Sequence, residues 1–181
     1  MIVETSVARR EDIGKRRQKE ISMYKIMFVC HGNICRSPMA EFIFKKIVSS
    51  NYKDNEFFVS SSATSSEEIW QGKGNPVYPP AKRELLKHGI TCEGKRAIKL
   101  TAEDYEKYDL FVCMDTANVR NATAILNGDK QGKIKKLLSF AGRDDDVADP
   151  WYSDRFDIAY EDINEGCQAL FNFITSKTNA K

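Results

Sequence analysis

The chain has 181 residues, 41% of them hydrophobic and 30% charged, which suffices for one globular domain without disulfides or metals. Its formal net charge is only +2, and residues 1–22 supply it, with six Lys or Arg residues against four Asp or Glu residues. Because the remainder is electrically balanced, the composition excludes a strongly basic nucleic-acid-binding protein.

The five cysteines are an odd number and lack the spacing of a disulfide framework. The sequence also shows no signal-peptide core and no apolar run of membrane-spanning length. We therefore expect a cytoplasmic protein that keeps its thiols free and has no membrane partner.

The first 22 residues differ from the rest of the chain, because they are charged, weakly periodic and followed by Met23. This pattern favours an appended tail over a docking helix. We expect a charged N-terminal extension over residues 1–22 and a single folded domain over residues 23–181.

Short apolar runs alternate with amphipathic segments through this domain. Strands are expected at residues 25–30, 56–61, 109–114 and 134–138, with a surface loop at 62–78 and a polar loop at 142–154. Helices are expected after the first strand, capped by Ser37 with Pro38 at the first position, and at residues 79–88 and 117–126. A short helix is expected at the capping box of Thr101 and Asp104, and a last helix is expected to be capped by Asp154. This alternation predicts an α/β fold, namely a doubly wound four-stranded parallel sheet flanked by helices on both faces.

The segment after the first expected strand carries the strongest chemical signal, and it reads Cys30-His31-Gly32-Asn33-Ile34-Cys35-Arg36-Ser37. Backbone N–H groups between a strand end and a helix N-terminus can point inward and form an anion site. Gly32 is expected to allow the tight turn, and Arg36 can hold two phosphate oxygens. Cys30 can then attack phosphorus as a thiolate, and Ser37 can donate a hydrogen bond when that thiolate leaves.

Two other interpretations of this loop are weaker. A buried cysteine beside a surface arginine would not require the glycine and the Ser-Pro pair together. A nucleotide-binding Gly-rich loop would require a Gly-Lys-Ser or Gly-Lys-Thr sequence, which this chain lacks.

The segment Asp149-Pro150-Trp151-Tyr152 lies in the last long loop. Cleavage of a phosphate ester needs a proton for the leaving oxygen, and this loop should reach the same sheet edge as Cys30. Asp149 is therefore the candidate general acid, while Trp151 and Tyr152 can form the wall of a pocket for an aryl phosphate. Without the cysteine loop, an ordinary surface turn would be the preferred interpretation.

The segments FVCHGNICRSPMAE and ADPWY resemble the motifs of the low-molecular-weight protein tyrosine phosphatases, and the similarity spans roughly residues 25–175. The resemblance implies a hydrolase that acts as a protein phosphatase on phosphotyrosine, through a cysteinyl-phosphate intermediate, with no metal or cofactor. Its partners would be a phosphotyrosine protein and inorganic phosphate or another oxyanion in the loop. Residues 23–181 would be the phosphatase catalytic domain.

The resemblance also assigns roles to individual residues. Cys30 would be the nucleophile, Arg36 the phosphate ligand, and Asp149 the general acid and then the base. The residues implied in binding phosphate or substrate are His31, Gly32, Asn33, Ile34, Cys35, Ser37, Trp70, Trp151 and Tyr152.

Among these, Asn33 and Ser37 would shape the loop and orient the nucleophile, with Ser61 supporting Asn33. Trp70 would be the aromatic residue of a variable loop beside the pocket. Lys95 departs from the pattern, because it stands where the family often carries a histidine that bonds to the phosphate loop.

Two further residues keep alternative interpretations. His31 is either a pocket-rim residue or an exposed, solvated one. Cys35 either resolves an oxidised Cys30 as a disulfide or only fills the core.

Three other functions are compatible with parts of the sequence. Arsenate reductase needs two further cysteines a few residues apart, and Cys92 and Cys113 are too distant for that. Protein-arginine phosphatases tend to have Thr at Ile34 and to lack the aromatic pair after Asp-Pro, so both features favour phosphotyrosine. A non-enzymatic phosphate-binding module would not need a cysteine, an arginine and an acid together.

Overall fold

The computed structural model describes residues 23–179, and the extension expected over residues 1–22 lies outside the described residues. Four strands form one parallel sheet, in the order β2 (Phe57–Ala63), β1 (Tyr24–Cys30), β5 (Leu110–Cys113) and β6 (Ile134–Lys136). From β1 the chain adds β2 on one side and β5 on the other, which confirms the doubly wound sheet. The carboxyl ends of β1 and β5 flank the switch point, where ligands bind in open α/β sheets.

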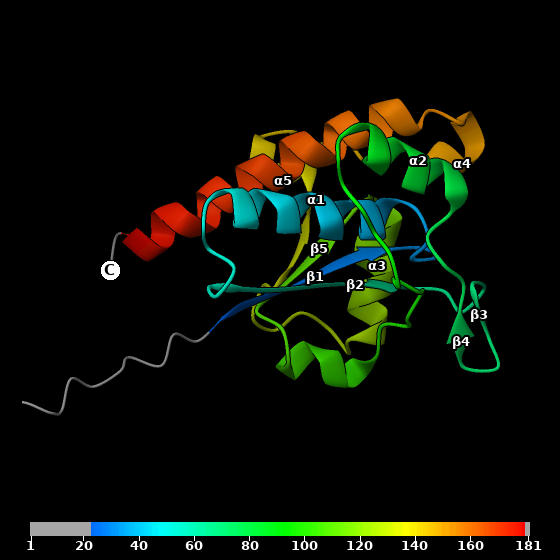
Figure 1. Cartoon of the computed structure of the whole chain (residues 1–181). Helices are drawn as coiled ribbons and strands as arrows, with labels where there is room; N and C mark the ends of the chain where they lie inside the picture. The colour runs from blue at the N-terminus through cyan, green and yellow to red at the C-terminus, as the bar shows by residue number, and fades with distance from the viewer. Residues whose placement is uncertain (1–22, 180–181) are drawn as a thin grey trace, which may run out of the picture.

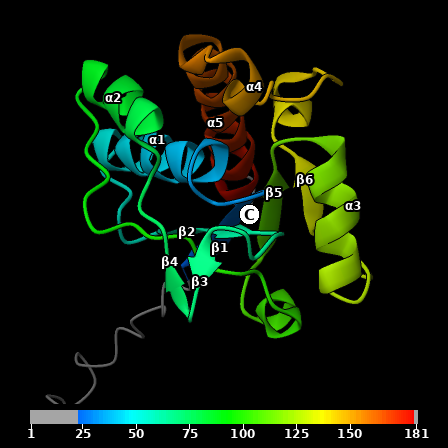
Figure 2. The same cartoon turned by 90° about the vertical axis from the view of Figure 1, so that its right-hand side faces the viewer.

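Helices cover both faces of the sheet, as expected (Figure 1). One face packs against α1 (Arg36–Ser50) and α5 (Phe156–Asn179), with α2 (Pro79–Lys87) beside them. The other face packs against α3 (Thr116–Ile125) and the 3-10 helix η1 (Ala102–Glu106). Figure 2 shows α3 on the opposite side of the sheet from α1 and α5.

The apolar run of β1 supplies both halves of the core, as a strand covered on both faces must. Ile26 and Phe28 point into the cluster under α1 and α5, whereas Met27 and Val29 point into the cluster under α3. All four side chains are at most 2% exposed. This packing fixes the direction in which β1 delivers Cys30 to the sheet edge.

The start of α1 differs from the sequence prediction. The helix begins at Arg36 with Cys35 at the N-cap position, so Ser37 is not the cap. The Ser37 hydroxyl lies within hydrogen-bond distance of Cys30 Sγ and accepts a bond from Asn33 instead. Tertiary contacts therefore override the local capping preference of serine.

Residues 62–78 are not the irregular loop that was expected. They contain a small antiparallel hairpin of β3 (Ile69–Trp70) and β4 (Lys73–Gly74). A Cβ atom on Gly74 would lie 1.9 Å from the carbonyl oxygen of Ala97, so only glycine fits at this point. The hairpin is thereby held close to the chain that follows α2.

The region after β6 also holds unpredicted structure, namely η2 (Leu138–Ala141) and the short helix α4 (Pro150–Ser153). Asp154 has a left-handed φ of 55° and ends α4, so the prediction that it caps the last helix was wrong. Its N–H donates to the carbonyl of Pro150 at 2.8 Å, where the chain turns toward α5. Within residues 23–179, no helix is long and apolar enough to cross a membrane.

Candidate active site

The loop between β1 and α1 begins at Cys30 and ends at Arg36, at the carboxyl edge of the sheet. The residue of this loop with a left-handed conformation is Asn33, which has a φ of 58°. Asn tolerates this conformation better than most residues because its short polar side chain can form local hydrogen bonds. At Gly32, a Cβ atom would lie 3.0 Å from Glu68 Cγ, so glycine leaves room for that side chain.

Cys30 is 3% exposed and its sulfur is held by two contacts. The backbone N–H of Asn33 donates to Sγ at 3.3 Å, and the hydroxyl of Ser37 lies 3.0 Å from it. Either the thiol or the hydroxyl can donate in the second contact, so the Asn33 N–H is the donor whose direction toward the sulfur is defined.

Arg36 is 4% exposed and lies between two carboxylates. Its guanidinium donates to Asp115 at 2.7 Å, to Asp149 at 2.6 Å and to the carbonyl of Val147 at 3.0 Å. Burial lowers the pKa of Arg36, but negative charge at Cys30 and at the two aspartates outweighs burial, so the pKa is raised overall. The cation is therefore permanent, and three acceptors hold the guanidinium in the orientation of this structure.

Asp115 is a site residue that the sequence analysis missed. It is the N-cap of α3 and accepts a hydrogen bond from the Asn118 N–H at 2.6 Å, while its other oxygen orients Arg36. The signal was present in the sequence, because Asp115 directly follows the third strand and precedes a helix.

Asp149 is the N-cap of α4, and its side chain is 30% exposed. One carboxylate oxygen accepts the N–H of Trp151 at 3.1 Å, and the other accepts the bond from Arg36. The loop is anchored to the sheet because the Val147 N–H donates to the carbonyl of Met114, just after β5. Asp149 is thus brought to the same sheet edge as Cys30.

Most of the predicted site residues converge on one pocket of about 180 Å³. Its lining consists of Cys30, His31, Gly32, Ile34, Cys35, Arg36, Glu67, Glu68, Asp149, Trp151 and Tyr152. Asn33 and Ser37 lie beneath the loop and are fully buried. Glu67 and Glu68 were not predicted, since nothing in a polar loop sequence indicates which residues turn toward a pocket.

The aromatic residues of the site differ in how firmly they are held. Trp151 packs against Tyr78, with ring centroids 5.0 Å apart, and the Tyr78 N–H donates at 2.8 Å to the carbonyl of Ile34 in the loop between β1 and α1. Tyr152 lines the pocket but is 88% exposed. Trp70, on β3, is 78% exposed and is not among the residues that line the pocket.

Two residues with alternative interpretations are now placed. The ring of His31 lines the pocket and lies 2.9 Å from a carboxylate oxygen of Glu67, and its side chain is 52% exposed, so His31 combines features of both interpretations. Cys35 lines the pocket and also belongs to the core, and burial raises the pKa of its thiol.

A buried polar network lies behind the loop. The Asn33 amide donates to the hydroxyls of Ser37 and Ser61, both at 2.8 Å, as the resemblance implied for Ser61. Lys95 also takes part, although it is a lysine, because its ammonium donates to the carbonyl of Ser61 at 2.9 Å and lies 3.3 Å from Glu41. Glu41 is a second residue that the sequence analysis missed.

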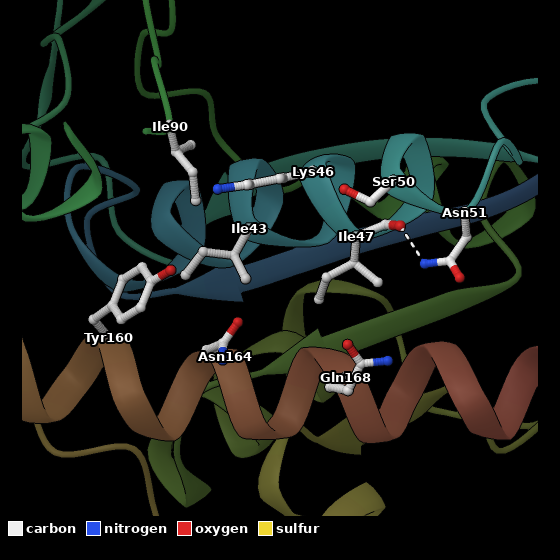
Figure 3. Close-up of a pocket in the computed structure, with 9 residues that line it drawn as sticks. All are labelled: Ile43, Lys46, Ile47, Ser50, Asn51, Ile90, Tyr160, Asn164 and Gln168. Atoms are coloured by element: carbon white, nitrogen blue, oxygen red, sulfur yellow. Dashed lines mark hydrogen bonds between the residues drawn. The ribbon is translucent and has the colours of Figure 1, made fainter. Parts of the chain in front are cut away.

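A second cavity lies between α1 and α5 (Figure 3). Its walls come from Ile43, Lys46 and Ile47 on one side and from Tyr160 and Asn164 on the other. The described residues around it include no cysteine, histidine or carboxylate, so it lacks the groups for phosphate-ester chemistry. Across residues 23–179, no cluster of His, Cys, Asp and Glu side chains has the geometry of a metal site.

The fold and this site agree with comparisons to known proteins. The sequence model of the family described as "Low molecular weight phosphotyrosine protein phosphatase" matches residues 25–180. The low molecular weight protein-tyrosine-phosphatase YfkJ of Bacillus subtilis is 31% identical over 150 residues, which are 82% of this chain and 94% of YfkJ. The crystal structure of YfkJ superposes with a TM-score of 0.79 at 30% identity, covering 86% of this chain and 97% of that chain.

Two more relatives extend the comparison. The low molecular weight phosphotyrosine protein phosphatase of Gallus gallus is 35% identical over 152 residues, which are 80% of this chain and 92% of the relative. The structure of Vibrio vulnificus Wzb in complex with benzylphosphonate has a TM-score of 0.69 at 27% identity, covering 82% and 97% of the two chains. Because the matches span most of its length, the chain belongs to the low molecular weight phosphotyrosine protein phosphatase family, whose members are hydrolases.

Proposed function

We propose that this protein hydrolyses phosphotyrosine in proteins through a cysteinyl-phosphate intermediate on Cys30, without a metal ion. The observation that supports this most directly is the convergence of Cys30, Arg36 and Asp149 on one pocket, from three separate elements. The backbone of the loop and the Arg36 cation supply the positive potential that a metal would otherwise supply.

In the first step, the Cys30 thiolate attacks phosphorus and the bond from phosphorus to the tyrosyl oxygen breaks. Asp149 gives its proton to that oxygen, which leaves as tyrosine. Arg36 binds two phosphate oxygens, so its bond to Asp149, 2.6 Å in this structure, must yield to the substrate. Phosphate binding thereby frees Asp149 for proton transfer.

In the second step, water attacks the phosphorus of the thiophosphate and Asp149, now a carboxylate, takes the proton of that water. The sulfur–phosphorus bond breaks and Cys30 leaves as a thiolate. Ser37, 3.0 Å from Sγ, stabilises the leaving thiolate by donating a hydrogen bond. Inorganic phosphate is released and the thiolate is regenerated.

We further propose an aryl phosphate as the reacting group of the substrate. Trp151 and Tyr152 provide apolar surface at the pocket, and the related Wzb binds benzylphosphonate, whose phosphorus is joined to an aromatic ring through one methylene group. The proposed catalytic domain is residues 23–181, with residues 1–22 as an extension. All five cysteines are unpaired thiols, which supports a cytoplasmic location.

The test is turnover of phosphotyrosine, phosphoserine and phosphoarginine peptides by the full chain, with a chelator present. We expect the phosphotyrosine peptide to be the preferred substrate, at a rate the chelator leaves unchanged. Cys30→Ser should abolish turnover while retaining phosphate binding, and Cys92→Ser, at a buried thiol outside the pocket, should remain active. An active Cys30→Ser protein would refute the nucleophile, and equal kcat/KM on all three peptides would refute the substrate class.

A further inference from the structure

Asp146 lies three residues before Asp149 and is a carboxylate that the proposed mechanism does not use. Its side chain is 42% exposed, yet one of its oxygens, Oδ1, accepts three hydrogen bonds. The Thr116 N–H donates at 3.1 Å, the Thr116 hydroxyl at 3.0 Å and the Lys136 ammonium at 2.9 Å. Because an exposed ion pair contributes little to stability, these contacts matter mainly for where they hold the chain.

The donors belong to α3 and β6, which lie side by side at the β6 edge of the sheet (Figure 2). Thr116 is the first residue of α3, and Lys136 is the last residue of β6. Lys136 also donates to the carbonyl of Asp144, so it holds the loop at a second point. Asp146 therefore ties the loop that carries Asp149 to both elements.

Two neighbouring contacts fix the register of this loop. The carbonyl of Met114, just after β5, accepts the Val147 N–H at 2.9 Å, and Thr116, two residues further on, donates to Asp146. Consecutive residues of the loop are thus paired with a single stretch of chain. This pairing sets the direction in which the backbone continues toward Asp149.

The side chain of Arg36 is another anchor of the loop, but it must change partners during the reaction. In this structure Arg36 donates to Asp149 at 2.6 Å and to the carbonyl of Val147 at 3.0 Å. Phosphate requires two of the guanidinium N–H groups, so the bond to Asp149 must yield when substrate binds. An anchor that does not involve Arg36 is then needed to keep Asp149 beside the leaving oxygen.

We propose that Asp146 is a positioning residue of the phosphatase reaction, because its bonds to Thr116 and Lys136 hold Asp149 in place after Arg36 has turned to the phosphate. This inference rests on the proposed role of Asp149 as general acid. Asp146 is not among the residues that line the pocket, so it acts through Asp149 and not on the substrate. Its effect should therefore appear in proton transfer and not in phosphate binding.

The charge of Asp146 agrees with this role. Burial raises the pKa of Asp146, but hydrogen bonds from Lys136 and Thr116 outweigh burial, so the pKa is lowered overall. At neutral pH the side chain is therefore a carboxylate, which accepts hydrogen bonds and cannot donate one. Its three donors consequently keep their direction toward the loop.

Asp145 offers a matched control for the test. It precedes Asp146, carries the same charge and is 55% exposed, but within residues 23–179 its carboxylate accepts from the Arg143 guanidinium and not from α3 or β6. Asp145→Ala and Asp146→Ala therefore each remove one carboxylate from the same loop. Only Asp146→Ala removes the contacts to Thr116 and Lys136.

The measurements are kcat for a phosphotyrosine peptide and for para-nitrophenyl phosphate, and inhibition by inorganic phosphate, all with the full chain. For Asp146→Ala we expect kcat on the peptide to fall about ten-fold, as for the loss of one hydrogen bond to a charged group. On para-nitrophenyl phosphate, whose leaving group departs readily without a proton, the loss should be only about two-fold. Phosphate inhibition should stay close to wild type, since Arg36 is untouched, and Asp145→Ala should resemble the wild type throughout.

A double-mutant cycle and a conservative variant separate positioning from a general loss of structure. Adding Asp146→Ala to Asp149→Asn should cause little further loss of kcat, since the group to be positioned is already gone. Asp146→Asn keeps an oxygen that can accept from Thr116, so it should retain most of the peptide activity that Asp146→Ala loses. Equal loss on the two substrates, or losses that multiply fully in the cycle, would overturn the proposal.

If Asp146→Ala does not fold, Thr116→Val removes one donor from the same oxygen and keeps the shape of the side chain. It must then lose more kcat on the peptide than on para-nitrophenyl phosphate, and an equal loss or no loss would overturn the proposal. The controls also separate this inference from the proposed function. An active Cys30→Ser protein, or an Asp149→Asn loss that is equal on both substrates, would refute the proposed mechanism, whereas a loss that depends on the leaving group in Asp149→Asn but not in Asp146→Ala would refute this inference alone.

Discussion

Replacing Asp149 with Asn is the most informative single change in the pocket, because it removes a proton and a charge while keeping the size of the side chain. Asparagine retains an oxygen that can accept the Trp151 N–H, which Asp149 accepts at 3.1 Å, so the start of α4 should be preserved. A general acid typically contributes about 10²–10⁴-fold, which corresponds to roughly 2.7–5.4 kcal/mol. We expect a kcat loss in that range for a phosphotyrosine peptide.

The loss should depend on the leaving group. A nitrophenolate leaves readily without a proton, so Asp149→Asn should reduce kcat with para-nitrophenyl phosphate by only about ten-fold. The assay is therefore a comparison of kcat for the two substrates in wild type and variant, with thermal unfolding measured alongside.

Asp149→Asn should also strengthen the binding of inorganic phosphate, because Asp149 is paired with Arg36. Asp149 occupies the guanidinium that phosphate must bind, and the two groups are 2.6 Å apart in this structure. Since the Asp149 side chain is 30% exposed, solvent screening reduces the pair to about 1 kcal/mol. Removing the charge should therefore lower the inhibition constant of inorganic phosphate about five-fold.

Asp154→Asn serves as the control, because Asp154 ends the same short helix in a left-handed conformation that asparagine also tolerates. It should leave kcat and phosphate inhibition close to wild type. Equal loss of kcat on both substrates, with unchanged phosphate inhibition, would show that Asp149 only structures its loop.

Two further predictions concern the pocket wall and the second thiol of the loop. Tyr152→Ala should raise KM for aryl phosphates about two- to ten-fold, because the ring lines the pocket. Thermal stability should not fall, because the residue is 88% exposed. An unchanged KM would place Tyr152 outside the substrate site. After peroxide converts Cys30 to a sulfenic acid, the Cys35 thiol should form a disulfide with it and release water. A thiol reductant should therefore restore more activity in wild type than in Cys35→Ser. Equal recovery in the two proteins would show that Cys35 only fills space.

The sequence predicted the parts of the fold that depend on local pattern. The apolar run of β1, the Ser-Pro pair and the helical spacing after it are sufficient to place a loop between a strand and a helix, and the structure agrees. The capping box at Thr101 is also present, since the Thr101 N–H donates to Asp104 at 2.9 Å. Convergence of Arg36 and Asp149 followed from one topological rule, that parallel strands end at a common edge.

The errors arose where tertiary contacts outweigh local preference. Ser37 was expected as a cap, but its hydroxyl is used by Cys30 and Asn33. The hairpin of β3 and β4 has two residues in each strand, which is too short for any periodicity to be visible. Trp70 was placed at the pocket by resemblance alone, and the turn of this hairpin leaves it 78% exposed.

The pair of Glu41 and Lys95 shows why a buried network cannot be read from sequence spacing, and also why stability alone does not account for it. Glu41 comes from α1, Ser61 from β2 and Lys95 from the segment after α2, and the three residues meet only because the fold brings these segments together. A buried ion pair commonly gives no more stability than apolar residues of the same volume, although losing one partner costs about 3–5 kcal/mol. An apolar pair would therefore fold as well but would offer Ser61 no acceptor. The Ser61 hydroxyl would then be a buried donor that has lost its acceptor, which is costly. The ionic pair thus has a consequence that packing does not supply, which is a buried acceptor that fixes the direction in which Ser61 donates.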